Sequence, residues 1–115
     1  MSKTHLYIAF APDYTDAEAY SRRMSVRPKH LERIHAFTKS GILRHGGILI
    51  APETLESETK KIIGSSMIFE AESVEAVRKI IEEDVYWAAN VWDKEKLAIY
   101  PYIPGTPLPP VPSQL

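Results

Sequence analysis

One short segment of the chain concentrates residue types that carry out proton chemistry. It runs from Arg27 to Arg33 and reads Arg-Pro-Lys-His-Leu-Glu-Arg. A helix that begins at Pro28 places His30 in its first turn, where the partial positive charge of the helix terminus disfavours an imidazolium ion. A neutral imidazole is the form that a general base needs near pH 7. The two arginines would attract an anionic substrate or an enolate. The alternative is a solvated basic helix face with a partly buried histidine.

Asp84 is the second candidate for chemistry. It follows Glu82 and Glu83 at the end of a predicted helix, where further negative charge is mildly unfavourable. Its carboxylate can cap the next helical turn. It can also orient a histidine and stabilise the protonated form of that histidine. The two roles are compatible, and both stay open.

Hydroxyl and aromatic side chains supply candidates for substrate binding. Ser65 lies in a Gly-Ser-Ser sequence within a predicted strand, where its hydroxyl can bond a substrate oxygen or serve local packing and backbone contacts. Tyr86 and Trp87 begin an aromatic run that ends at Trp92. Aromatic rings line ligand pockets, but they also fill ordinary cores and dimer interfaces. Both interpretations stay open for these residues.

The composition disfavours several functional classes. The 115 residues carry a net charge of −1, so there is no basic excess for nucleic-acid binding. The chain has no cysteine, and its four histidines lack metal-ligand spacing, so we expect no metal site. No phosphate-binding glycine loop is present, and we expect no cofactor. No run of about 18 apolar residues occurs, and no signal peptide is recognisable, so we expect a cytoplasmic protein that does not contact a membrane.

The secondary-structure elements that position these residues are predicted from hydrophobic periodicity and from the proline, glycine and capping residues that bound the periodic segments. Alternating or continuous apolar runs predict strands at 5–11, 42–51, 61–71 and 96–102. Helical spacing predicts a short helix at 16–24 and a second from Pro28 to a C-cap at Gly41, because proline removes a donor inside a helix. Ser73 is a predicted N-cap for a helix to about 83, and a short turn follows at 85–89. The order is that of a ferredoxin-like βαββαβ fold of the α+β class.

Helices can cover only one face of such a sheet. The other face also appears apolar in the sequence, and we expect it to be covered by a second copy of the chain in a two-fold homodimer. The residues expected on that face are Tyr7, Ala9, Ile63, Met67, Phe69, Leu97 and Ile99.

The chain divides into a domain at 1–102 and a tail at 103–115. The tail has five prolines, so we expect it to be extended. It would wrap a dimer partner or be disordered. A third possibility is that Pro107–Pro112 docks in the aromatic groove of another protein.

The ordered set of these motifs resembles the YCII-like family. The set comprises Arg27-x-x-His30-Leu31, Gly41, Gly47, Gly64-Ser65, Asp84-x-Tyr86 and Pro101, and it covers about residues 5–102. The resemblance implies a dimeric α+β barrel made from two ferredoxin-like sheets. It also implies a catalytic pair at His30 and Asp84. One related type is similar to dehydrochlorinases that act on hydroxylated aromatic rings. The run from Tyr86 to Lys94 resembles fungal members, whereas Val85 departs from the proline that the family often carries there.

Together, the residues and the resemblance lead to one hypothesis. The protein would be a cofactor-independent lyase or isomerase acting on a small oxygenated, cyclic or aromatic metabolite. His30 would be the general base, and Asp84 would hold and stabilise it. The substrate-binding residues would be Arg27, Ser65, Tyr86 and Trp87. The alternative is a non-catalytic, small-ligand-binding or accessory dimeric protein.

Overall fold

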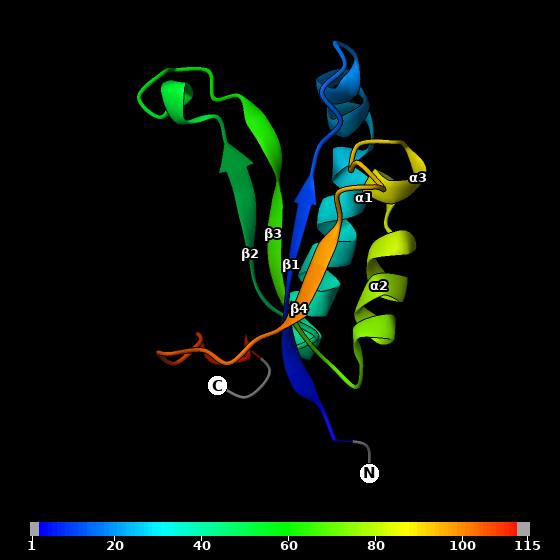
Figure 1. Cartoon of the computed structure of the whole chain (residues 1–115), viewed down its shortest axis with the longest axis vertical. Coiled ribbons are helices and arrows are strands. Elements are labelled where there is room, and N and C mark those ends of the chain that lie inside the picture. The colour runs from blue at the N-terminus through cyan, green and yellow to red at the C-terminus, as the bar shows by residue number, and fades with distance from the viewer. Residues whose placement is uncertain (1–2, 113–115) are drawn as a thin grey trace.

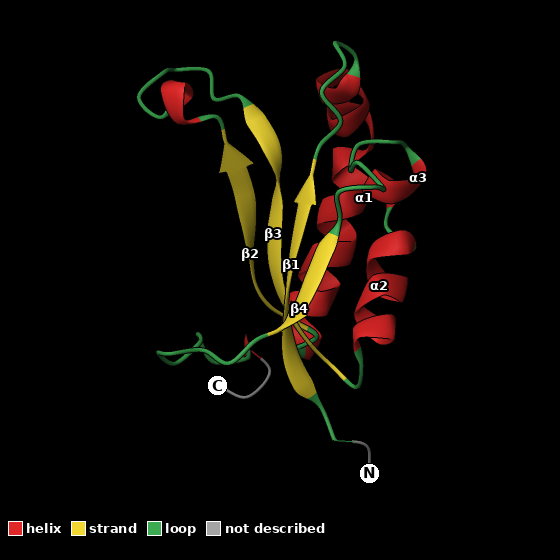
Figure 2. Cartoon of the chain, in the orientation of Figure 1, coloured by secondary structure: helices red, strands yellow, loops and turns green. Residues whose placement is uncertain are grey.

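The computed structural model of the chain describes residues 3–112. Its elements are β1 (His5–Pro12), α1 (Ala19–Ser40), β2 (Leu43–Ile50), a short 3-10 helix (Pro52–Thr54), β3 (Ile62–Ala71), α2 (Val74–Glu82), α3 (Val85–Ala88) and β4 (Ala98–Pro101). The strands form one antiparallel sheet in the order β2-β3-β1-β4, and the helices lie along one face of it (Figures 1 and 2). The predicted α+β class and βαββαβ order are therefore confirmed. The first two residues of the predicted domain and the last three of the predicted tail lie outside the described residues.

The prediction of two helices separated at Pro28 was wrong. Helix α1 is continuous across this proline. Pro28 and the neighbouring Met24 both face solvent. The carbonyl that loses its helical partner at proline can therefore turn toward water, which lowers the cost of proline inside the helix. One consequence is that about three helical turns before His30 belong to the same rigid element as the histidine itself.

The predicted helix caps are confirmed. Gly41 ends α1 with a left-handed φ of 86°, a conformation that glycine adopts without strain. The Ser73 hydroxyl accepts a hydrogen bond from the backbone N–H of Ala76 at the start of α2. Asp84 caps α3 in the same way by accepting from the N–H of Tyr86. These caps fix where each helix begins or ends relative to the sheet.

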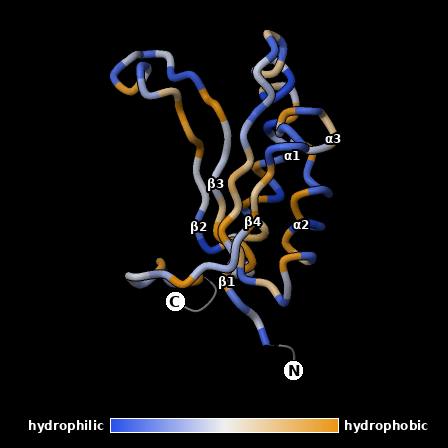
Figure 3. The backbone as a smooth tube through the Cα atoms, in the orientation of Figure 1, coloured by the Kyte–Doolittle hydropathy of each residue, from blue (hydrophilic) through white to orange (hydrophobic). Residues whose placement is uncertain are grey.

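The hydrophobic core lies between the sheet and the helices. Helix α1 packs beside β2, and α2 packs beside β3 and β4. Helix α2 alternates between hydrophobic and hydrophilic residues in Figure 3, as an element with one buried side must. Buried aromatic and aliphatic side chains from the sheet and helices fill this layer. They are Tyr7, Ala9, Ala11, Leu43, Met67, Phe69, Val77, Ile81, Tyr86, Val91 and Trp92.

The expected assignment of residues to the two sheet faces was wrong in part. Tyr7, Ala9, Met67 and Phe69 point toward the helices rather than away from them. Because side chains alternate along a strand, the face without helices carries the intervening residues. These include Leu6, Ile8, Phe10, Ile68 and Tyr100. The open face is therefore apolar, as expected, but other residues make it so.

The two central strands approach closely at Gly64. This glycine is opposite Pro12 in the pairing of β1 with β3. A Cβ atom at position 64 would lie 2.8 Å from the backbone oxygen of Ala11, which is too close for any other residue without a shift of the strands. The glycine therefore allows the tight pairing that sets the position of Ser65 next to it.

The Pro-rich segment packs on its own chain. Residues 103–112 leave β4, pass the end of the sheet and return to the start of β2 (Figure 1). Val111 is buried beside Gly41, and an Arg44 Nη2–H donates to the carbonyl oxygen of Pro109 at 3.4 Å. The described part of the tail contains no α-helix and no β-strand. No helix within residues 3–112 is both long enough and apolar enough to cross a membrane.

Candidate functional site

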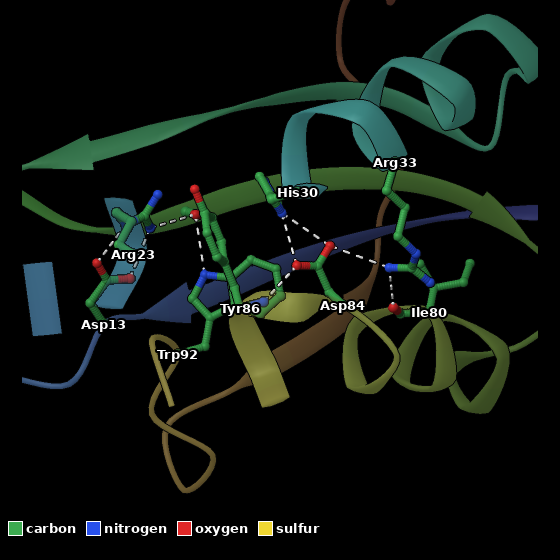
Figure 4. A network of polar contacts seen from close by, with 9 residues as sticks. Asp13, Arg23, His30, Arg33, Ile80, Asp84, Tyr86 and Trp92 are labelled. Atoms are coloured by element: carbon green, nitrogen blue, oxygen red, sulfur yellow. Dashed lines mark hydrogen bonds and ion pairs between the residues drawn. The ribbon is translucent and has the colours of Figure 1, made fainter. Parts of the chain in front are cut away.

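A buried histidine and a buried aspartate form the centre of the site. His30 Nδ1 lies 2.9 Å from Oδ1 of Asp84 and 3.0 Å from Oδ2 (Figure 4). A carboxylate only accepts hydrogen bonds, so the contact places a proton on Nδ1 and leaves Nε2 as the basic nitrogen of the neutral ring. Nε2 has no hydrogen-bond partner among residues 3–112. The pair therefore fixes which ring nitrogen is available to a ligand.

His30 lies in the middle of α1, and its predicted position in the first turn of a helix was wrong. The positive end of the helix dipole acts only within the first turn, so it does not reach this imidazole. The imidazole is instead contacted by the carboxylate of Asp84 and by two aromatic rings.

Asp84 is held by two groups besides the histidine. Its Oδ1 accepts from the backbone N–H of Tyr86 at 2.9 Å, and its Oδ2 lies 3.3 Å from Nη1 of Arg33. The same Nη1 donates to the carbonyl oxygen of Ile80 at 2.8 Å. Asp84 is only 2% exposed, and these contacts compensate its buried charge. It both caps α3 and contacts His30, so the two contacts considered from the sequence are present together.

Two rings restrict the orientation of the imidazole. Tyr86 stacks on His30 with 3.8 Å between ring centroids and an interplanar angle of 15°. Trp92 meets the same imidazole edge-on, at 5.8 Å. Figure 4 shows Tyr86 between His30 and Arg23, whose guanidinium carbon lies 4.6 Å from the tyrosine ring centroid. Burial raises the pKa of the Tyr86 phenol, while the nearby Arg23 and Arg27 oppose that rise, so the phenol is protonated at neutral pH.

A cavity of about 440 Å³ opens between α1 and strands β2 and β3. This volume is within the range of small-molecule sites. Arg27, His30, Ser65 and Tyr86 all line it, so the structure brings four of the six predicted site residues together around one space. Asp84 stands behind His30. Trp87 is not among the lining residues, and its ring lies near the ammonium group of Lys94 instead.

The Pro-rich segment forms part of the cavity wall. Residues from Pro109 to Pro112 line the space together with Gly46, Gly47 and Ile48 of β2. The sequence did not predict this contact, because an extended segment carries no pattern that identifies the surface it packs on. The tail thus limits the space that a ligand can occupy.

The sequence did not predict a buried ion pair beside the cavity, formed by Arg23 and Asp13. Asp13 follows β1, and its two carboxylate oxygens accept from Nε and Nη2 of Arg23, both at 2.9 Å. Arg23 Nη2 also donates to Ser65 Oγ at 3.1 Å. One signal was available: Arg23, Arg27 and His30 are spaced four and three residues apart, which puts them on one side of a continuous helix. The incorrect break at Pro28 concealed it.

Within residues 3–112, no group of three or more histidine, aspartate and glutamate side chains is arranged to hold a metal ion. Three arginines line the cavity, and their N–H donors suit an oxygen-bearing organic ligand.

The family model for the YCII-related domain matches residues 6–101. The chain belongs to this family. It is 33% identical over 97 residues to Protein YciI of Escherichia coli O6:H1, a match that covers 84% of this chain and 95% of YciI. It is 31% identical over 96 residues to Fusaric acid biosynthesis protein 2 of Gibberella fujikuroi, covering 84% of this chain and 90% of that protein. Relatives therefore occur in fungi as well as in bacteria.

The match to a further relative is confined to a small part of a longer protein. The chain is 32% identical over 96 residues to Aspartate kinase FUB3 of Fusarium oxysporum f. sp. lycopersici, but it spans only 17% of that protein's length. Among solved structures, the fold is similar to that of 5-chloro-2-hydroxyhydroquinone dehydrochlorinase (TftG) from Burkholderia phenoliruptrix AC1100, in complex with 2,5-dihydroxybenzoquinone. The TM-score is 0.69 at 20% identity, covering 87% of this chain and 95% of the other. At that identity the likeness shows a shared fold.

Proposed function

We propose that the protein is a lyase or isomerase that acts on a small oxygenated, cyclic or aromatic metabolite, with His30 as its general base. The observation that carries the proposal is the buried pair of His30 and Asp84 at the wall of a ligand-sized cavity. The reaction needs no cofactor, because each of its steps is a proton transfer or the departure of a leaving group. The similarity in fold to a dehydrochlorinase supports the same class of reaction.

The first step would be removal of a proton by Nε2 of His30. The proton comes from a carbon next to a carbonyl group or from a phenol, and its electron pair passes into an enolate or phenolate. The ring then carries a positive charge, which the carboxylate of Asp84 stabilises through Nδ1–H. Return of the proton to another carbon completes an isomerisation, whereas expulsion of a leaving group with its electron pair completes an elimination. A positioned base of this kind contributes about 10²–10⁴-fold to the rate.

Other residues of the cavity would bind and orient the substrate. Arg27 supplies positive charge near the developing oxyanion, and Ser65 offers a hydroxyl group to a substrate oxygen. The ring of Tyr86 forms a flat wall beside the imidazole, which suits a planar substrate. This arrangement supports the same division of roles that the sequence suggested, without Trp87.

Hydrogen exchange from carbon tests the proposal directly. The wild type and His30→Gln would be incubated in D₂O with a panel of hydroxyquinones, chlorinated phenols, unsaturated lactones and cyclic diketones, and followed by proton NMR and chloride release. We expect the wild type to catalyse exchange, isomerisation or chloride loss with at least one compound, and His30→Gln to lose that activity. A wild type that binds a compound but returns it without deuterium would instead indicate the non-catalytic ligand-binding protein. Activity that survives His30→Gln undiminished would contradict the proposed role of the histidine.

We also propose that the chain forms a homodimer through the open face of its sheet. Ile8 and Tyr100 are cross-strand neighbours on that face, and Phe10 is 38% exposed there. A contiguous apolar surface of this kind favours association with a second copy. Native mass spectrometry should show a dimer for the wild type and a monomer for Phe10→Lys. A monomeric wild type at micromolar concentration would contradict this proposal.

A further inference from the structure

The guanidinium group of Arg23 is buried but incompletely bonded. Arg23 is 3% exposed and lines the cavity. Its Nε–H and one Nη2–H donate to the two oxygens of Asp13, and the second Nη2–H donates to Ser65. A guanidinium group has five N–H donors, so two remain on Nη1. The Tyr86 hydroxyl accepts a hydrogen bond from Arg23, which helps to oppose the rise in the pKa of that phenol, so one Nη1–H is directed to Tyr86 and the other has no acceptor among the described residues. Figure 4 shows this guanidinium group beside the ring of Tyr86.

The hydroxyl group of Ser65 can act toward the cavity only as a donor. Its oxygen accepts from Arg23 Nη2 at 3.1 Å and from the indole Nε1–H of Trp92 at 3.3 Å. Neither partner can accept a hydrogen bond, and a hydroxyl oxygen has two lone pairs, which these contacts occupy. The hydroxyl proton must therefore go elsewhere. Ser65 is 5% exposed and lines the cavity, and no residue in the 3–112 range accepts this proton.

The charges around the cavity have one sign. Arg23, Arg27 and Arg44 line it together with two histidines, and no aspartate or glutamate is among the lining residues. The carboxylates that compensate these charges, Asp13 and Asp84, stand behind Arg23 and His30 instead. The cavity therefore presents donors and positive charge, and Nε2 of His30 is a basic nitrogen that faces it.

We propose that Arg23 Nη1 and the Ser65 hydroxyl form a subsite for an anionic oxygen of the ligand, such as a phenolate, an enolate or a carboxylate. Asp13 and Trp92 are positioning residues, because they hold Arg23 and Ser65 in this orientation. A catalytic role for this subsite rests on the proposed function, because the enolate formed by His30 would place its charge here. Binding of an anion at the subsite does not require turnover.

A pair of probes that differ in charge and by two methyl groups tests the subsite. The anionic probe is 2,5-dihydroxybenzoquinone, whose acidic hydroxyl groups are ionised at neutral pH, and the neutral probe is its dimethyl ether. Isothermal titration calorimetry gives the ratio of the two affinities. We expect the wild type to prefer the anion by at least about tenfold, because a hydrogen bond to a charged group contributes at least that factor. Equal affinities, or no binding of the anion, would overturn the proposal.

Two variants remove the hydrogen-bond donors of the subsite without leaving the buried carboxylate of Asp13 uncompensated. Arg23→Lys keeps a positive charge for Asp13 but lacks Nη1, and Ser65→Ala removes the hydroxyl. Each should lower the anion preference by about three- to tenfold or more. The ratio is informative because a general loss of packing would weaken both probes equally. The matched control is Arg22→Gln, on the same helix, whose guanidinium group pairs with Asp16 and does not line the cavity.

The outcomes separate this inference from the proposed function. If His30→Gln stops proton exchange but keeps the anion preference, both proposals are supported. If the wild type shows the preference but no exchange with any compound, the subsite stands and the proposed reaction fails. If exchange occurs while Arg23→Lys and Ser65→Ala both keep the full preference, the reaction stands and the subsite is refuted.

Discussion

The double role of Asp84 makes its replacement a quantitative test of the site. In Asp84→Asn the amide oxygen can still accept from the N–H of Tyr86, because asparagine caps helices about as well as aspartate. The amide nitrogen then faces the donor of Arg33, and the contact with His30 loses its charge. A hydrogen bond to a charged group contributes about 1.5–3 kcal/mol and a neutral one about 1 kcal/mol, so the two changes should cost about 2–5 kcal/mol of unfolding free energy.

The alanine variant separates the cap from the charge. Asp84→Ala should cost about 1 kcal/mol more than Asp84→Asn, which is the typical contribution of an N-cap side chain. Catalysis should respond differently. Loss of about 3 kcal/mol of stabilisation of the His30 imidazolium corresponds to about 10²-fold in rate, and this part should be common to both variants.

Urea unfolding followed by circular dichroism measures the stability difference, and deuterium exchange into the substrate measures the rate. The control is Glu82→Gln, two residues earlier, whose ion pair with Arg78 is exposed. That variant should change stability by less than about 1 kcal/mol and leave the rate unchanged. If Asp84→Asn is as stable and as active as the wild type, the carboxylate does not support His30, and the reasoning is refuted.

Three further predictions concern the surroundings of the site. Gly64→Ala should lower the unfolding free energy by about 1–3 kcal/mol, because its Cβ would meet the Ala11 oxygen at 2.8 Å; an unchanged urea midpoint would contradict the close approach. Val111→Asp should release the tail from the end of α1, seen as faster amide exchange in residues 104–112 and weaker ligand binding, whereas unchanged exchange would mean that this valine does not anchor it. Arg22 lowers the pKa of Asp16 from 3.8 to about 2, so Asp16 stabilises the fold above pH 4 and this effect is lost as the pH falls toward 2. The difference in urea midpoint between wild type and Asp16→Asn should therefore shrink between pH 5 and pH 2; a constant difference would contradict the ion pair.

Local rules were sufficient to predict the order of elements. Strand composition and the caps at Gly41, Ser73 and Asp84 are properties of neighbouring residues, and each predicted cap is present. The helix break at Pro28 failed because the cost of an internal proline depends on whether the orphaned carbonyl reaches water. That is a tertiary property, which the local sequence does not contain.

The site could be predicted only in part, for a similar reason. His30 and Asp84 were identified by residue type and by the family resemblance, and the structure places them in contact. The pairing of Arg23 with Asp13 depends on the packing of α1 against the end of β1, so no local sequence pattern predicts it. The sheet faces were misassigned because β1 is apolar at nearly every position, which removes the alternation that identifies the buried side.

The contribution of the tail to the cavity has a consequence for how this protein can diversify. The family match ends at residue 101, whereas the wall formed by Pro109–Pro112 comes later in the chain. Insertions, deletions or substitutions in that wall leave the sheet, the helix caps and the pair of His30 and Asp84 untouched. The size of the ligand that fits the cavity can therefore change without a change in the folding of the domain. New ligand ranges are accessible through a segment outside the family match, while the buried pair of His30 and Asp84 is retained.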